Sequence, residues 1–145
     1  MKFNTKTRYG LRTMLELSIH ENSNEGVLLK EISKSQEVTI RYLDRIVALL
    51  KTAGLVVNVA GKKSGYRLAR PAKDISIYDV YLAFEDEMAI IDCLLPGGEC
   101  SRKKNCVLRG FWCDLNSDIK SRMQSVNIGT LAENYRNTDD PSKVA

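Results

Sequence analysis

The stretch 39–69 constrains the fold more than any other, because its hydrophobic period changes from helical to alternating at Gly54. Before that glycine, apolar residues recur every three or four positions, as in an amphipathic helix: Leu43, Ile46, Val47 and Leu50. Thr39 is the expected N-cap of this helix, and Gly54 is the residue that ends it. After Gly54, residues 55–59 and 66–69 predict two short strands joined by a basic, glycine-flanked loop. The stretch therefore predicts a helix followed by a β-hairpin.

Two more helices precede this stretch. Residues 6–20 have apolar spacings of three and four, and residues 21–26 have the composition of a loop. A short helix follows, in which we expect three side chains to face inward: Leu28, Leu29 and Ile32. Three helices and then a hairpin predict a mainly α fold with a small β-hairpin wing, a winged helix-turn-helix.

The second half predicts a different arrangement. Ser76, with Asp79 three residues later, predicts a capped helix over residues 77–87. Pro96, Gly97 and Gly98 exclude regular structure around the cysteines. A long helix is expected from Cys106, with an apolar stripe and neighbours at Val107, Phe111, Trp112, Leu115, Ile119, Arg122, Met123 and Val126. So small a domain gives this helix little to pack against. We therefore expect a long C-terminal dimerisation helix in a two-fold homodimer, the alternative being ordinary packing in a monomer.

Charge divides the chain in the same way. Residues 1–70 contain 13 Lys or Arg and 6 Asp or Glu, a net charge of +7, and residues 71–145 contain 9 and 12, a net charge of −3. A basic half favours a polyanionic partner such as nucleic acid, although clustered solvated charge is the alternative. We predict a DNA-binding domain over 1–72 and a sensor and dimerisation region over 73–135. After a short helix at 130–135, we predict a disordered tail over 136–145.

Several classes of protein are disfavoured. No apolar stretch approaches the roughly 20 residues of a membrane helix, and the first residues lack the apolar run of a signal peptide, so we expect a cytoplasmic protein without membrane contact. There is no Gly-rich phosphate loop and no placeable carboxylate pair, so we expect no enzyme. A winged-helix adaptor that binds proteins stays open as an alternative.

All four cysteines fall between Cys93 and Cys113, with the spacing C-x6-C-x5-C-x6-C. In a reducing cytosol such a cluster indicates metal binding or redox sensing more than disulfides. The spacing lacks the paired CxxC motifs of a zinc ribbon, and soft thiolates suit iron–sulfur clusters or zinc. An iron–sulfur sensor, a cluster-free thiol switch, a zinc site and unreactive cysteines are the alternatives.

The chain resembles the Rrf2 family of winged-helix transcriptional regulators, and its IscR-like members in particular. The resemblance covers residues 1–135 and rests on TKTRYGLRTMLELS, EISKSQEVTIRYLDRIVALLKTAGLV, GKKSGYRLARPAKDISIYDV, CLLPGGECSRKKNCVLRGFW and VNIGTLAE. It implies a homodimeric regulator that binds a near-palindromic operator in double-stranded DNA.

In such a fold the third helix enters the major groove, where guanidinium and carboxylate groups read base edges. The residues expected there are Thr39, Arg41, Asp44 and Arg45. The resemblance gives Asp44 the position of an acidic base-reading residue, whereas a solvated ion-pair face is the alternative for the set. Phosphate contacts are expected from the wing and the first helix, at Lys62, Lys63, Ser64, Lys6 and Tyr9.

The resemblance also implies that Cys93, Cys100 and Cys106 ligate a [2Fe–2S] cluster, with [4Fe–4S] as the alternative. IscR-like members take a fourth ligand from a histidine three residues after the third cysteine, and here that position is Arg109. NsrR-like members take a carboxylate from the partner's first helix, where this chain has Arg8. The single histidine, His20, is expected at the surface. The remaining candidates for the fourth ligand are a partner residue, Cys113, Asp92 and Glu99.

Overall fold

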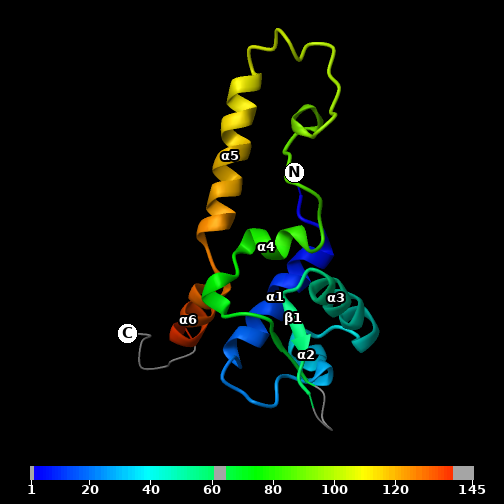
Figure 1. Ribbon diagram of the computed structural model, residues 1–145, viewed down its shortest axis with the longest axis vertical. Coiled ribbons are helices and arrows are strands. Elements are labelled where there is room, and N and C mark those ends of the chain that lie inside the picture. The colour runs from blue at the N-terminus through cyan, green and yellow to red at the C-terminus, as the bar shows by residue number, and fades with distance from the viewer. Residues whose placement is uncertain (1, 61–64, 139–145) are drawn as a thin grey trace.

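The computed structural model describes residues 2–60 and 65–138. Its first half consists of three helices and a hairpin: α1 (Thr5–Ile19), α2 (Leu29–Gln36), α3 (Ile40–Thr52), β1 (Val56–Asn58) and β2 (Tyr66–Leu68). Its second half consists of a 3-10 turn, α4, a second 3-10 turn and two further helices: η1 (Ala72–Asp74), α4 (Ile77–Leu82), η2 (Asp92–Leu94), α5 (Arg109–Ser125) and α6 (Ile128–Thr138). The helices α1 to α3 and the hairpin gather at one end of the molecule, as a winged helix-turn-helix (Figure 1).

Helix α3 forms where the sequence predicts it. The Thr39 hydroxyl accepts a hydrogen bond from the Tyr42 N–H at 3.2 Å, which satisfies one donor at the start of the helix. Gly54 has a φ of +74°, the left-handed conformation in which a helix commonly ends. The four residues of the predicted apolar stripe are all buried, so this stripe is confirmed.

The predicted hairpin is also confirmed, and it gains a third partner. Strands β1 and β2 pair antiparallel, with Val57 opposite Arg67. Val27 forms a bridge to β2, exchanging two backbone hydrogen bonds of 2.8 Å with Tyr66. The wing therefore rests against the loop after α1, a contact that the local sequence pattern did not reveal.

One inward-facing residue was wrongly predicted. Ile32 is fully buried, but the side chain of Leu28 is 38% exposed. Leu28 precedes α2 as its N-cap, and its N–H donates to the Glu31 carboxylate at 2.9 Å. Because Leu28 lies outside the helix, the helical period does not place its side chain on the buried face.

The last helix belongs to the same core as the first three. Ile75, Val80 and Ile128 are fully buried in one cluster with the apolar residues of α1 and α3. Two backbone hydrogen bonds of 2.9 Å join the segment before α4 to the one before α6, from the Ile77 N–H to Val126 and from the Ile128 N–H to Ile75. The two halves of the chain therefore share their hydrophobic core.

Helix α6 is longer than the predicted 130–135. It begins at Ile128 and continues to Thr138, so residues 136–138 are helical rather than part of a disordered tail. The Arg136 guanidinium donates to the carbonyls of Ser18 and Ile19, at 3.3 and 3.0 Å, and this bonding fixes the last turn against the end of α1. Residues 139–145 lie outside the described residues.

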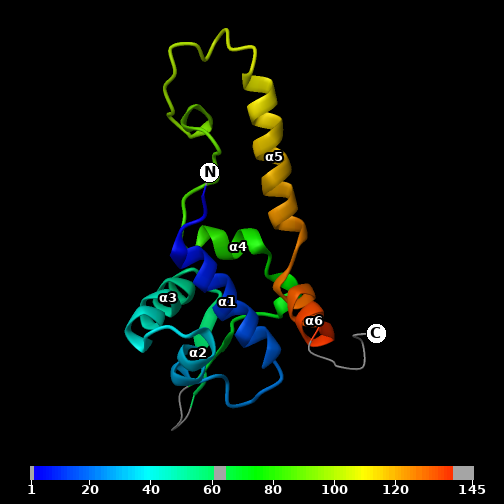
Figure 2. The ribbon, with the colours of Figure 1, turned by 180° about the vertical axis from the view of Figure 1, so that it is seen from behind.

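Residues 86–125 form an arm that rises from the helical body (Figures 1 and 2). Its main element is α5, which at 17 residues is about 25 Å long, and the cysteine loop, residues 93–106, lies at its far end. Helix α4 ends at Leu82 rather than at residue 87, and α5 begins at Arg109 rather than at Cys106. The prediction therefore made α4 too long at its C-terminal end and α5 too long at its N-terminal end.

Candidate DNA-reading surface and cysteine loop

The outward face of α3 carries the side chains predicted to read DNA. Arg41, Asp44 and Arg45 are exposed, and so is Thr39 at the start of the helix. Within residues 2–60 and 65–138, none of the three charged side chains forms an ion pair, so the alternative of a paired surface face is not observed. Two guanidinium groups and one carboxylate are thus available to an external partner.

The predicted phosphate contacts differ in their surroundings. Lys62, Lys63 and Ser64 lie outside the described residues. The half-buried ring of Tyr9 packs edge-on against Tyr42 at 5.7 Å, and the guanidinium of Arg12 lies 5.3 Å from the Tyr9 ring centre. The Tyr9 ring therefore packs against α3 through Tyr42.

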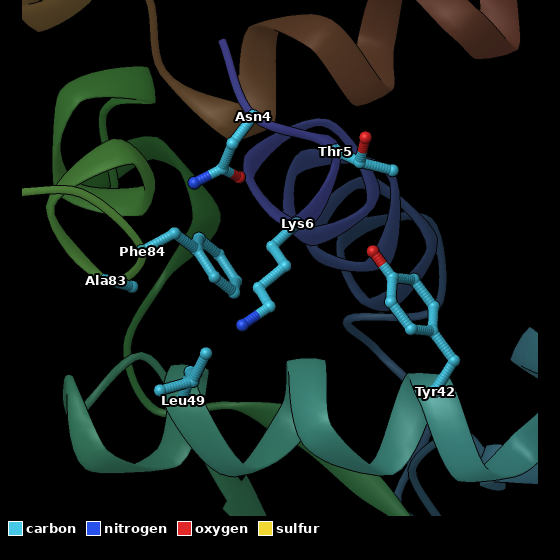
Figure 3. A pocket seen from close by; sticks show the side chains of 7 residues that line it. All are labelled: Asn4, Thr5, Lys6, Tyr42, Leu49, Ala83 and Phe84. Atoms are coloured by element: carbon cyan, nitrogen blue, oxygen red, sulfur yellow. The ribbon is translucent and has the colours of Figure 1, made fainter.

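Lys6, in contrast, extends into a pocket of about 500 Å³ between the start of α1, α3 and the residues after α4 (Figure 3). The pocket is lined by Asn4, Thr5, Lys6, Tyr42, Leu49, Ala83 and Phe84. The Lys6 side chain passes between the rings of Phe84 and Tyr42 and ends above Leu49 (Figure 3). The sequence did not reveal this pocket, because its three walls come from distant segments.

The residues just after α4 hold the base of the arm against α1. The ring of Phe84 lies directly over Gly10, where even a Cβ atom would collide with it. The Glu85 carboxylate accepts hydrogen bonds from the Asn4 N–H at 3.2 Å and from the Thr7 hydroxyl at 2.9 Å. These contacts link the arm to the helix that supports α3.

All four thiols are free: in the cysteine loop Cys93 and Cys106 are half-buried and Cys100 is exposed, and on α5 Cys113 is exposed. Within the described part of the chain, which includes all four cysteines, no three His, Cys, Asp or Glu side chains are gathered closely enough to hold a metal ion. The donor chemistry suits an iron–sulfur cluster, since thiolates are its usual ligands, but the loop of the single chain does not hold these donors together.

Arg109, at the position of the histidine expected from the resemblance, has a structural role. Its guanidinium donates to the Cys93 carbonyl at 3.3 Å, and its backbone N–H donates to the Cys106 carbonyl at 3.3 Å. One residue thus connects the two ends of the loop. A guanidinium has no lone pair to offer a metal, so Arg109 does not fit the histidine's role.

One face of α5 is joined to residues 87–93 by side-chain hydrogen bonds and an ion pair. Besides Arg109, Asn116 bonds both the Ile90 N–H and the Met88 carbonyl, at 3.0 and 3.2 Å, and Lys120 pairs with Glu87 at 3.4 Å. The pKa of Lys120 is raised because the side chains of Tyr78 and Glu87 face it. Spacings of four, three and four place residues 109, 113, 116 and 120 on one helix face. Cys113 therefore lies on the same face of α5 as the residues that bond the segment ending at Cys93.

No helix in residues 2–60 or 65–138 combines the length and the apolar character that a bilayer crossing requires.

The sequence matches the family model described as "Rrf2: Iron-dependent Transcriptional regulator" over residues 3–134. It is 32% identical over 136 residues to the protein rrf2 of Nitratidesulfovibrio vulgaris, covering 94% of this chain and 88% of that protein. It is 33% identical over 131 residues to the HTH-type transcriptional regulator IscR of Vibrio campbellii, covering 90% of this chain and 77% of that protein.

Solved structures show the same architecture. IscR of T. potens superposes with a TM-score of 0.76 at 26% identity, covering 96% of this chain and 91% of that one. The oxidized form of Staphylococcus aureus CymR superposes with a TM-score of 0.71 at 30% identity, covering 92% and 97%. CymR of B. subtilis, described as the global cysteine regulator, gives 0.74 at 26% identity, covering 92% and 97%. These likenesses confirm the predicted fold class, and the relatives are regulators and not enzymes, as predicted.

Proposed function

The chain belongs to the Rrf2 family of DNA-binding transcriptional regulators, and on that premise we propose that it is a homodimer that reads a near-palindromic operator with α3 and responds to a signal through the cysteine loop. The observation that supports DNA reading most directly is the exposed row on α3, with two guanidinium groups and a carboxylate that have no partner among the described residues. Arginine pairs bidentately with guanine, and a carboxylate accepts from the cytosine amino group. We propose that residues 1–72 supply DNA reading and residues 73–135 supply sensing and dimerisation.

Replacing Arg45 by alanine should weaken binding to the operator by about 1–3 kcal/mol and relax the preference for sequence, because a base contact would be lost. The operator can first be selected from a randomised duplex pool, and affinity then measured by fluorescence anisotropy on selected and scrambled duplexes. Lys73→Ala is the control, since it removes one exposed positive charge beside α6. Equal losses on the selected and scrambled duplexes would contradict base reading by Arg45.

Exposed apolar side chains on the arm support the proposal of a homodimer. Three apolar side chains at the junction of the cysteine loop and α5 are exposed: Val107 at 95%, Leu108 at 58% and Phe111 at 58%. Monomeric proteins seldom leave such neighbouring apolar groups in water, and a second copy of the arm would cover them symmetrically.

Phe111→Asp should therefore weaken dimerisation by about 100-fold or more, since a carboxylate would be buried without a partner. Sedimentation equilibrium measures the dissociation constant. The control is Ile40→Asp, which places the same charge at an exposed apolar position on α3. A dimer that tolerates Phe111→Asp as well as Ile40→Asp would show that this end of the arm is not the interface.

For the sensor, we propose that Cys93, Cys100 and Cys106 supply thiolate ligands to an iron–sulfur cluster, of which [2Fe–2S] is the form implied by the resemblance to IscR. The likeness to IscR proteins supports this assignment. The cluster, when bound, supplies a centre that reacts with oxidants or nitric oxide. Among the candidates for the fourth ligand, Cys113 is favoured because it lies on the face of α5 that bonds residues 87–93. Arg109 on that face already donates to the Cys93 carbonyl.

A cluster-free thiol switch is the second candidate. It is favoured by the four free thiols and by the likeness to a regulator whose solved structure is described as an oxidized form. In either case the physical link to DNA would be the same. Phe84 and Glu85, which directly precede the arm, contact α1, so a change in the loop would act on α1 and then on α3.

A further inference from the structure

We propose that the pocket around Lys6 receives one backbone phosphate of the bound DNA, with the Tyr42 hydroxyl as its second contact. This inference deepens the proposed DNA binding and rests on it. It adds Tyr42 to the DNA-contact residues. One phosphate would then contact both α1, through Lys6, and α3, through Tyr42.

The first observation is the Lys6 ammonium. The side chain extends from the start of α1 into the pocket, past the rings of Phe84 and Tyr42 (Figure 3). No hydrogen bond or ion pair joins Lys6 to another residue in the described ranges 2–60 and 65–138. Leu49, Ala83 and Phe84 give the pocket apolar walls, and the exposed Lys6 side chain leaves its ammonium open to an anion from outside.

The second observation is how Tyr42 is held. Its ring packs edge-on against Tyr9, which in turn lies beneath the Arg12 guanidinium, so the position of the hydroxyl is fixed by two packed side chains. That hydroxyl lies at the pocket wall, on the opposite side of the Lys6 stem from Phe84 (Figure 3). A phenol hydroxyl donates a hydrogen bond to a phosphate oxygen as readily as serine or threonine does.

The neighbouring charges permit an anion. The only carboxylate that contacts the start of α1 among the described residues is that of Glu85, which already accepts from the Asn4 N–H and the Thr7 hydroxyl. On the other side, the Arg8 guanidinium donates to the Thr5 hydroxyl at 3.4 Å and adds positive charge close to the pocket.

The third observation is the position of the pocket beside the DNA-reading row. Tyr42, Arg45 and Leu49 are spaced three and four apart, so they form one row on α3. Two of them line the pocket, and the third is the exposed arginine proposed to read a base. A duplex whose base edges meet Arg45 therefore brings its sugar-phosphate backbone past the mouth of this pocket.

The test uses the full chain with Lys6→Gln, Tyr42→Phe and the double variant. Tyr42→Phe keeps the ring that packs on Tyr9, so the fold should persist, and thermal unfolding checks it. We expect each single variant to weaken binding about tenfold on selected and scrambled duplexes alike. We expect Lys6→Gln to lower the slope of log affinity against log salt by about 1. Lys73→Gln is the charge-matched control and should change neither quantity beyond the general effect of net charge.

Duplexes with one neutral methylphosphonate, moved along the backbone, identify the phosphate. Wild type should lose affinity sharply at one position per half-site where the double variant loses none. A variant that keeps the wild-type profile at every position would overturn the pocket assignment. Inorganic phosphate, titrated at constant ionic strength without DNA, tests the other source of the same group. Saturable binding that needs Lys6 but does not compete with DNA would overturn the backbone phosphate as occupant. If the wild type binds no duplex at all, the proposed function itself fails, which is a separate result.

Discussion

Each of the single substitutions Cys93→Ser, Cys100→Ser and Cys106→Ser will leave the anaerobically purified protein colourless. The wild type, in contrast, will be brown and contain iron and acid-labile sulfide. A hydroxyl is a poor ligand for the soft iron of a cluster, so the loss should be nearly complete for each of the three positions. Visible absorption and iron and sulfide analysis measure it. Wild-type protein that is colourless and contains stoichiometric zinc would contradict the cluster.

The fourth ligand can be tested by exchanging two residues on one face of α5. Cys113→Ser should lower cluster retention, and adding Arg109→His should restore it, since a histidine would then stand where IscR-like members have their ligand. Arg109→His alone serves as the control, because it also removes the hydrogen bond to the Cys93 carbonyl. If Cys113→Ser retains the cluster as firmly as wild type, the fourth ligand comes from Asp92, Glu99 or the partner chain.

Ile128→Ala will destabilise the protein by about 2–5 kcal/mol, although residue 128 is far from the DNA-binding segment in sequence. Ile128 is fully buried in the cluster formed by α1, α3 and the wing, so truncation leaves a cavity there. This loss is a large fraction of the roughly 5–15 kcal/mol that stabilises most domains. Chemical denaturation without DNA measures the change.

The matched control is Ile40→Ala, the same substitution at a site that is 49% exposed at the start of α3. We expect its effect to stay within about 0.5 kcal/mol. A similar small effect for Ile128→Ala would show that α6 does not contribute to the core of the DNA-reading half.

The elements that could be predicted from the sequence are those with local signals. Helix α3 has a capping threonine, an apolar stripe and a terminal glycine within 16 residues, and each of these acts through neighbours in the chain. The capping box at Ser76 is another such case, with its predicted partner Asp79 accepting from the Ser76 N–H at 2.8 Å.

What the sequence did not reveal depends on contacts between distant residues. Helix α4 ends at Leu82, and two residues later Phe84 packs on Gly10, more than seventy positions away, a contact that no local pattern reports. The pocket around Lys6 likewise combines three segments. The iron–sulfur cluster and all of its ligands remain predictions, because the ligands of a loop need not be neighbours in sequence.

The docking of α6 on α1 has a consequence for synthesis. Chains are made from the N-terminus, and a domain normally folds once its last core residue has left the ribosome. Here Ile128 and the Arg136 contacts close the core around α1, so the nascent DNA-reading half stays incomplete until residues 128–138 emerge. A chain that ends before these residues would therefore contain all four cysteines but lack the part of the core that Ile128 fills, and we expect it to be less stable than the full chain.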